Sequence, residues 1–143
     1  MNACRTLFAV LLLGFAPAAF PRDEPVNDPA KTLAKLSKER VEAAHKTFQV
    51  MWENYREGRR VSDDTLYRWS LRWLEAERQL SKQQPDQVAA YKGHRDRMAE
   101  LERLIRKVRR VGQGTVDELS AAEFYKSEAE IWLLQAEGEK KGP

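Results

Sequence analysis

His94 is the side chain best suited to chemistry in this sequence, because it falls on the apolar stripe of a predicted helix. An imidazole in such a place can ligate a metal ion or act as a buried pH switch. The second histidine, His45, belongs to a different predicted helix, and no histidine lies three or four residues from His94. We therefore interpret His94 as a structural histidine, keep it as a weak candidate for a metal ligand, and predict no metal and no cofactor.

Four carboxylates could in principle form an acid–base pair or bind a cation: Asp63, Asp64, Asp117 and Glu118. They follow Ser62 and Thr115, the predicted N-caps of two helices, and the positive end of the helix dipole already accounts for acids there. Nucleophile triads, glycine-rich phosphate loops and calcium-loop spacings are missing from the sequence. We predict no catalytic residue and a protein that is not an enzyme.

Aromatic residues lie at or beside the apolar stripes: Trp52, Trp69, Trp73, Trp132, Phe124 and Tyr125. Most are expected in the core, since large apolar side chains at helical spacing usually pack there. One or two could instead form a patch that binds a partner. Trp73, beside Leu74, widens its stripe enough to allow this second interpretation.

The helices predicted to carry these side chains include one stretch of sequence that occurs twice. An offset of 53 residues superposes Ser62 on Thr115, Asp64 on Asp117 and Leu66 on Leu119. Each copy has a helical pattern, a break at Gly58 or at Gly112 and Gly114, and a second, capped helix. This indicates an internal repeat of two helical hairpins, about 30–83 and about 85–138.

The expected helices have about 28, 21, 26 and 23 residues, and nothing in the pattern indicates a strand. We predict an all-α, up-down-up-down antiparallel bundle over residues 30–138. The joint around Pro85 leaves an alternative, in which the second and third helices form one long kinked helix. The predicted core stripes are Leu33, Leu36, Val41, Ala44, Phe48, Met51 and Tyr55; then Leu66, Trp69, Trp73, Ala76 and Leu80; then Tyr91, His94, Met98, Leu101, Ile105 and Val108; and finally Ala122, Tyr125, Ala129, Trp132 and Ala136.

The N-terminus resembles a signal peptide over residues 1–19, with Arg5 ahead of an apolar run and small residues at the cleavage site. An uncleaved N-terminal anchor is the alternative, and it would be the protein's one contact with a membrane. Residues 20–29 are predicted as a linker and residues 139–143 as a frayed tail. We expect a periplasmic or secreted protein without disulfides, because its single cysteine, Cys4, lies in the leader.

Charge is distributed unevenly along the chain. Residues 40–110 carry 17 basic against 11 acidic residues, whereas residues 111–143 carry 3 against 7. Solvated helix faces explain this pattern, and a basic surface for an acidic partner is the sharper interpretation. Nucleic acid is not expected as a partner, since acids interleave with the basic residues.

The run Gly58-x-x-x-Ser62-x-Asp64-x-Leu66 and its second copy resemble the periplasmic hairpin tips of TolC-like outer-membrane efflux proteins. The chain lacks the membrane strands of that family, so the resemblance does not imply a channel. The run from Tyr67 to Glu77 and the segments around His94 and Trp132 are similar to exported planctomycete-type helical-repeat proteins of unassigned function.

These resemblances imply that the hairpin tips meet at one end of the bundle and contact a partner. The predicted partner-binding residues are Gly58, Arg59, Arg60, Ser62, Arg109, Arg110, Gly112 and Thr115. We expect a non-enzymatic protein-interaction module at the cell envelope, binding an envelope protein or another copy of itself. A periplasmic helical-hairpin sensor of metal or stress is the alternative.

Overall fold

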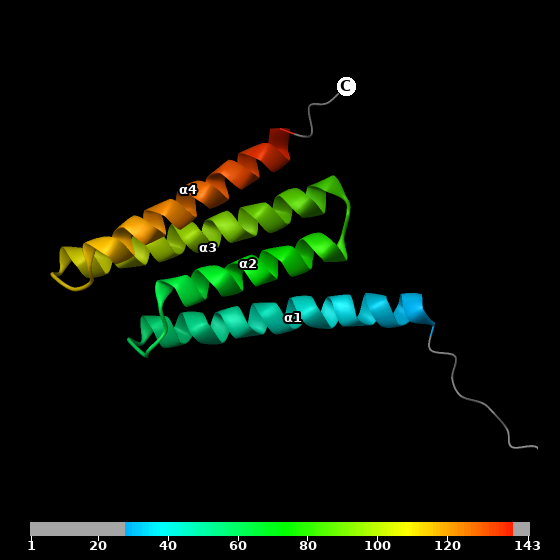
Figure 1. The fold of residues 1–143 in the computed structure, drawn as a ribbon, viewed down its shortest axis with the longest axis horizontal. Coiled ribbons are helices and arrows are strands. Elements are labelled where there is room, and N and C mark those ends of the chain that lie inside the picture. The colour runs from blue at the N-terminus through cyan, green and yellow to red at the C-terminus, as the bar shows by residue number, and fades with distance from the viewer. Residues whose placement is uncertain (1–27, 139–143) are drawn as a thin grey trace, which may run out of the picture.

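The structure, a computed structural model, describes residues 28–138. It contains four helices: α1 (Pro29–Arg56), α2 (Asp63–Leu80), α3 (Gln84–Arg110) and α4 (Val116–Gly138) (Figure 1). Within that range no strand is present, and the predicted all-α class is confirmed. The predicted signal peptide, nearly all of the linker and the C-terminal tail lie outside the described residues.

Local sequence signals begin the helices where they were expected. The Asp28 carboxylate accepts the Ala30 N–H at 3.0 Å and caps α1, which has Pro29 in its first turn. Ser62 caps α2 through a hydrogen bond from the Thr65 N–H at 3.1 Å. In this way side-chain oxygens satisfy N–H groups that have no partner inside the helix.

A reciprocal capping box begins α4. The Glu118 N–H donates to the Thr115 hydroxyl at 3.2 Å, and the Thr115 N–H donates to the Glu118 carboxylate at 2.8 Å. The Asp64 carboxylate forms an ion pair with the Arg68 guanidinium within α2, at an N–O distance of 2.5 Å. Two of the carboxylates considered for acid–base chemistry therefore stabilise helices: Glu118 caps α4, and Asp64 forms an ion pair within α2.

Glycines with a left-handed backbone follow the C-caps of α1 and α3. Gly58 has φ 71° and Gly112 has φ 79°, a region that glycine enters without the steric cost that a β-carbon brings. The chain reverses direction after each of them, so α1 with α2 and α3 with α4 form two antiparallel hairpins.

The joint between α2 and α3 is a turn, not a kink. Ser81 and Gln83 have extended backbones, and Pro85 occupies the first turn of α3, where its missing N–H costs nothing. The Gln87 amide closes the turn by donating to the Arg78 carbonyl at 2.7 Å. The alternative of one long kinked helix is therefore wrong, and α2 ends at Leu80, a little earlier than expected.

The four helices are arranged side by side in chain order (Figure 1). α2 packs against α1 and α3, and α4 packs against α3 with a smaller contact to α2. This leaves α1 and α4 at the two edges of the array. The antiparallel arrangement that we predicted is present, but its edge helices each keep one face uncovered.

One core joins all four helices. Its buried members are Phe48, Leu66, Met98, Leu101, Ile105, Ala122 and Ala129. The stripes predicted for α3 and α4 supply most of them, whereas part of the α1 and α2 stripes was wrong. Leu33 and Leu36 are 67% and 55% exposed because the start of α1 reaches past the end of α2, and Leu80 is 41% exposed at that end (Figure 1).

The seam of α2 is also displaced from the predicted one. Leu66, Ser70 and Leu74 are buried, while Trp69 and Trp73 are half-buried at its margins. Because Leu66, Ser70 and Leu74 recur every four residues, the small hydroxyl of Ser70 lies in the interior and faces α3. Among the described helices, none has the length and apolar character that crossing a membrane requires.

Candidate functional site

A buried polar cluster joins α2 to α3. The Ser70 Oγ lies 2.7 Å from the His94 Nδ1, and the Arg97 Nε donates to the same oxygen at 2.7 Å. The Arg97 guanidinium also donates to the Ser70 carbonyl at 3.3 Å. Ser70 and His94 are both completely buried inside the helix array, whereas Arg97 is half-buried.

Aromatic rings enclose the imidazole of His94. Trp132 of α4 stacks on it with ring centres 5.7 Å apart, and Tyr67 of α2 lies at 6.1 Å. Since Arg97 can only donate, the Ser70 hydroxyl is free to donate to Nδ1, and we assign the ring proton to Nε2. Within residues 28–138 this Nε2 is a buried nitrogen without a hydrogen-bond partner.

This environment keeps His94 neutral. Burial, and to a smaller extent the nearby positive charge of Arg97, together lower the pKa of His94 from 6.5 to about 3. Water no longer solvates the imidazolium, and the adjacent cation repels it. His94 is therefore a neutral, completely buried side chain of the core.

Arg97 is the charged member of the cluster and is half-buried. Its guanidinium carbon lies 3.9 Å from the Trp73 ring centre, a cation–π geometry. Burial lowers the pKa of Arg97 to about 10, while Glu77 and Asp96 oppose that shift. Burial also raises the pKa of Glu77, which Arg97 and then Trp73 partly counteract.

A serine hydroxyl hydrogen-bonded to a histidine is the geometry of a nucleophile with its general base. Here neither atom reaches solvent, so a substrate cannot contact the pair unless α2 and α3 separate. Sequence reasoning missed Ser70 and Arg97. The available signal was a small polar residue four positions after Leu66 on an apolar seam, with an arginine three positions after His94.

The two histidines do not come together. His45 of α1 packs against Trp73 with ring centres 4.4 Å apart. The rings that pack on His94 are different ones, Tyr67 and Trp132. Among residues 28–138, no group of three or more histidine, cysteine, aspartate or glutamate side chains is placed to hold a metal ion.

The two loops that carry or adjoin the predicted tip residues lie at one end of the molecule. The α1–α2 loop, residues 57–62, and the α3–α4 loop, residues 111–115, lie at the same end of the array (Figure 1). Exposed basic side chains surround both loops: Arg56, Arg59, Arg60, Arg106, Lys107, Arg109 and Arg110. We call this end, with these side chains, the basic tip.

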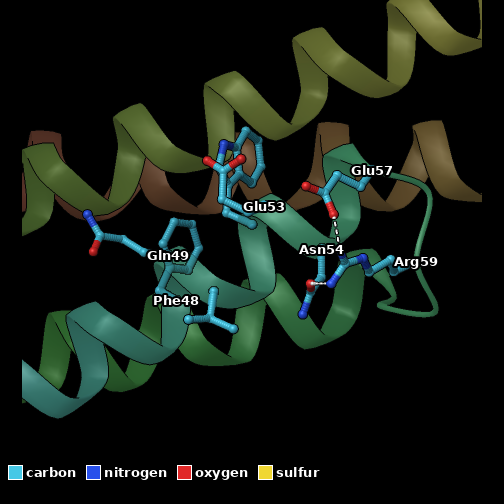
Figure 2. A pocket seen from close by; sticks show the side chains of 8 residues that line it. Phe48, Gln49, Glu53, Asn54, Glu57 and Arg59 are labelled. Atoms are coloured by element: carbon cyan, nitrogen blue, oxygen red, sulfur yellow. Dashed lines mark hydrogen bonds and ion pairs between the residues drawn. The ribbon is translucent and has the colours of Figure 1, made fainter.

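The cations of the basic tip differ in how they are paired. Arg59 contacts Glu57 at 2.6 Å and donates to the Asn54 side chain at 3.1 Å, so it stabilises its own loop (Figure 2). In the part of the chain that the structure describes, four others make no ion pair and no side-chain hydrogen bond: Arg60, Lys107, Arg109 and Arg110.

A groove adjoins the basic tip. Three neighbouring hollows share Trp52. The largest of the three has a volume of about 540 Å³ and runs along α1 from Phe48 to Arg59 (Figure 2). The other two lie between α1 and α3, where Arg97, Glu100, Leu104 and Lys107 line the opposite wall. We call these hollows together the Trp52 groove.

Of the aromatic residues weighed as a partner patch, Trp52 lines a groove, while Trp73 and Trp132 pack on the polar cluster. Phe124 is 61% exposed on α4.

Comparison with known protein families, curated proteins and solved structures finds no match to this chain. The resemblances drawn from the sequence therefore stay predictions.

Proposed function

We propose that this chain is a non-enzymatic interaction module that binds an acidic segment of another protein through its basic tip. The observation that carries the proposal is that Arg60 of the α1–α2 loop and Arg109 and Arg110 of the last turn of α3 lie at one end, without acidic partners among the described residues. Charges left unpaired and exposed attract an oppositely charged partner and orient its approach.

The Trp52 groove supports the same proposal by supplying apolar contact next to the charge. Trp52 and Phe48 form its apolar part, and the groove extends toward the tip at Arg59. Interfaces commonly combine a large aromatic anchor with a charged rim, because the anchor gives affinity and the rim gives orientation. A short segment with an apolar side chain in the groove and acidic residues at the tip matches both features, because the carboxylates Glu53 and Glu57 that line the groove are paired with Arg56 and Arg59.

An enzymatic role has less support than binding. Among the described residues, Ser70 and His94 have nucleophile–base geometry, but both are buried, and the low pKa of His94 makes its imidazole a weak base. The proposed place of action, the cell envelope, rests on the N-terminal sequence, which resembles a signal peptide.

The proposal is tested with the triple variant Arg60→Glu, Arg109→Glu and Arg110→Glu. Arg59 is left unchanged, because it pairs with Glu57 and its loss would alter the loop itself. We expect capture of envelope proteins by the variant to be lost in a crosslinking pull-down from the native cell, with helicity by circular dichroism retained. Partner capture should also weaken as salt rises, since the contact is ionic.

The matched control reverses three exposed lysines at the opposite end of the array: Lys31→Glu, Lys38→Glu and Lys82→Glu. It changes the net charge by the same amount but leaves the tip intact, so capture should persist. Equal loss in both variants would mean that total charge matters and not the tip. Unchanged capture by the tip variant would overturn the proposal.

The alternative of a metal or stress sensor has no observation of its own in the described residues. It required a ligand cluster around His94 or His45, and these side chains are instead occupied by Ser70 and by Trp73. Titration calorimetry with zinc, copper and nickel addresses it directly, and micromolar binding would revive it.

A further inference from the structure

The outer face of α4 carries an uncovered apolar stripe. Its apolar members are Val116, Phe124, Ile131 and Leu134, each between 54% and 66% exposed. Together with Ser120 and Ser127 they recur every three or four residues along the helix. This stripe lies opposite the face that buries Ala122, Ala129 and Ala136, and we call it the α4 stripe.

The α4 stripe is strongly acidic around its margins. α4 contains six acidic residues and one basic residue, a net charge of −5. Two α4 helices facing each other would bring these charges together, and like charges across an interface are unfavourable. The helix that covers this stripe is therefore expected to be basic.

The opposite edge of the array offers such a helix. α1 contains six basic and three acidic residues, a net charge of +3. Leu36, Ala43 and Val50 are exposed on it at seven-residue spacing, with Leu33 one turn before them. Spacing of this kind forms the seam of a helix pair. Lys35 and Lys46 flank these residues, which we call the α1 stripe.

We infer that copies of this chain associate head to tail, with the α1 stripe of one copy covering the α4 stripe of the next. Inside the chain, α2 is the second helix of its hairpin and is covered by α3, the first helix of the following hairpin. The contact between copies repeats this order, because α4 is a second helix and α1 is a first helix. This surface is separate from the basic tip, although Val50 of the α1 stripe also lines the Trp52 groove, and the inference does not depend on the proposed function.

A head-to-tail contact has a testable consequence that a symmetric one lacks. Each copy offers both surfaces, so association continues beyond a dimer unless the copies close into a ring. The mass of the full chain, measured by light scattering or sedimentation, should rise with concentration past that of two chains. Raised salt should lower the mass at a given concentration, because the stripes carry opposite charge.

Two single substitutions separate the surfaces. Ile131→Asp blocks the α4 stripe and Leu36→Asp blocks the α1 stripe, and both residues are exposed, so the fold should tolerate the changes. Each variant alone should be monomeric at concentrations where the unsubstituted chain associates. An equimolar mixture should form a complex of two chains, because each variant keeps the surface that the other lacks. Val111→Asp, 71% exposed in the α3–α4 loop, is the matched control and should associate normally.

Three results would overturn the inference. A monomeric unsubstituted chain at millimolar concentration would show that the stripes do not pair. Association of the Leu36 variant alone, with a monomeric Ile131 variant, would indicate a symmetric α4 contact. Association that persists in both variants would place the contact elsewhere, including residues 1–27. If the Ile131 variant loses helicity, Leu134→Asp on the same stripe replaces it.

Discussion

His94 shows how the surroundings of one residue set its chemistry. A histidine exposed to water changes charge near neutral pH. In the interior, between Ser70 and the rings of Tyr67 and Trp132, its pKa falls to about 3. In the folded protein the proton is therefore excluded over the range in which the unfolded chain would bind it. This difference links the stability of the fold to pH.

The free energy of unfolding should consequently fall as the pH drops from about 6.5 toward about 3, by about 1.4 kcal/mol per pH unit from His94 alone. The sign follows because the unfolded state binds one more proton than the folded state across this window. The raised pKa of Glu77 acts in the opposite direction, since the folded state then holds a proton more readily. Urea denaturation at a series of pH values measures the sum.

The variant His94→Asn isolates the contribution of the imidazole, because its amide oxygen can still accept from Ser70 but does not titrate. We expect lower stability at neutral pH and a shallower decline in acid. His45→Asn removes the other histidine and serves as the comparison, with the acid-dependent decline from His94 retained. An unchanged slope in the His94 variant would show that carboxylates alone govern acid unfolding.

At the scale of the elements, helix ends are decided by short local patterns. Ser62, Thr115 with Glu118, and Asp28 each supply the oxygen that a helix start needs. Gly58 and Gly112 supply the left-handed residue after a helix end. These devices repeat in the two hairpins, and they bring both loops to the end where the basic tip is formed.

Gly58→Ala should lower the free energy of unfolding by about 1–2 kcal/mol, the cost of a left-handed backbone for a residue with a β-carbon. The added methyl group would meet no atom of the surrounding structure within 4 Å, so the cost comes from the residue's own backbone and not from a clash with neighbouring side chains. Gly58→Asn is the matched control and should cost less, because asparagine tolerates this region. Equal stability of the alanine variant and the unsubstituted chain, by thermal or urea unfolding, would contradict the argument.

At the scale of the whole molecule, the two hairpins share one core. Phe48 and Leu66 from the first hairpin pack with Met98, Leu101 and Ala129 from the second. The polar cluster of Ser70, His94 and Arg97 crosses the same boundary. Each hairpin therefore completes the other's interior, although their outer edges remain open.

We accordingly expect one cooperative unfolding transition, with helix content and tryptophan fluorescence changing together. Met98→Ala should lower the free energy of unfolding by about 2–5 kcal/mol, since Met98 is completely buried in the shared core. Leu134→Ala, on the exposed outer face of α4, should change it by less than about 0.5 kcal/mol. Two separated transitions would mean that the hairpins fold independently.

The sequence by itself determined the class of fold, the four helices, their caps and the position of the two loops. These features depend on neighbours a few residues away, such as Thr115 with Glu118 or the glycine after a helix end. The stripes of α3 and α4 were predictable for the same reason, since apolar periodicity is a local property.

Only the tertiary structure decided which faces are covered. Leu33, Leu36 and Leu80 fit an apolar pattern but lie exposed, because no helix packs over those turns. Ser70 and Arg97 meet His94 because α2 and α3 lie side by side, a contact that no short-range pattern encodes. Burial and pKa depend on such long-range neighbours, and so the polar cluster, the Trp52 groove and the open edges became visible only once the helices were arranged in space.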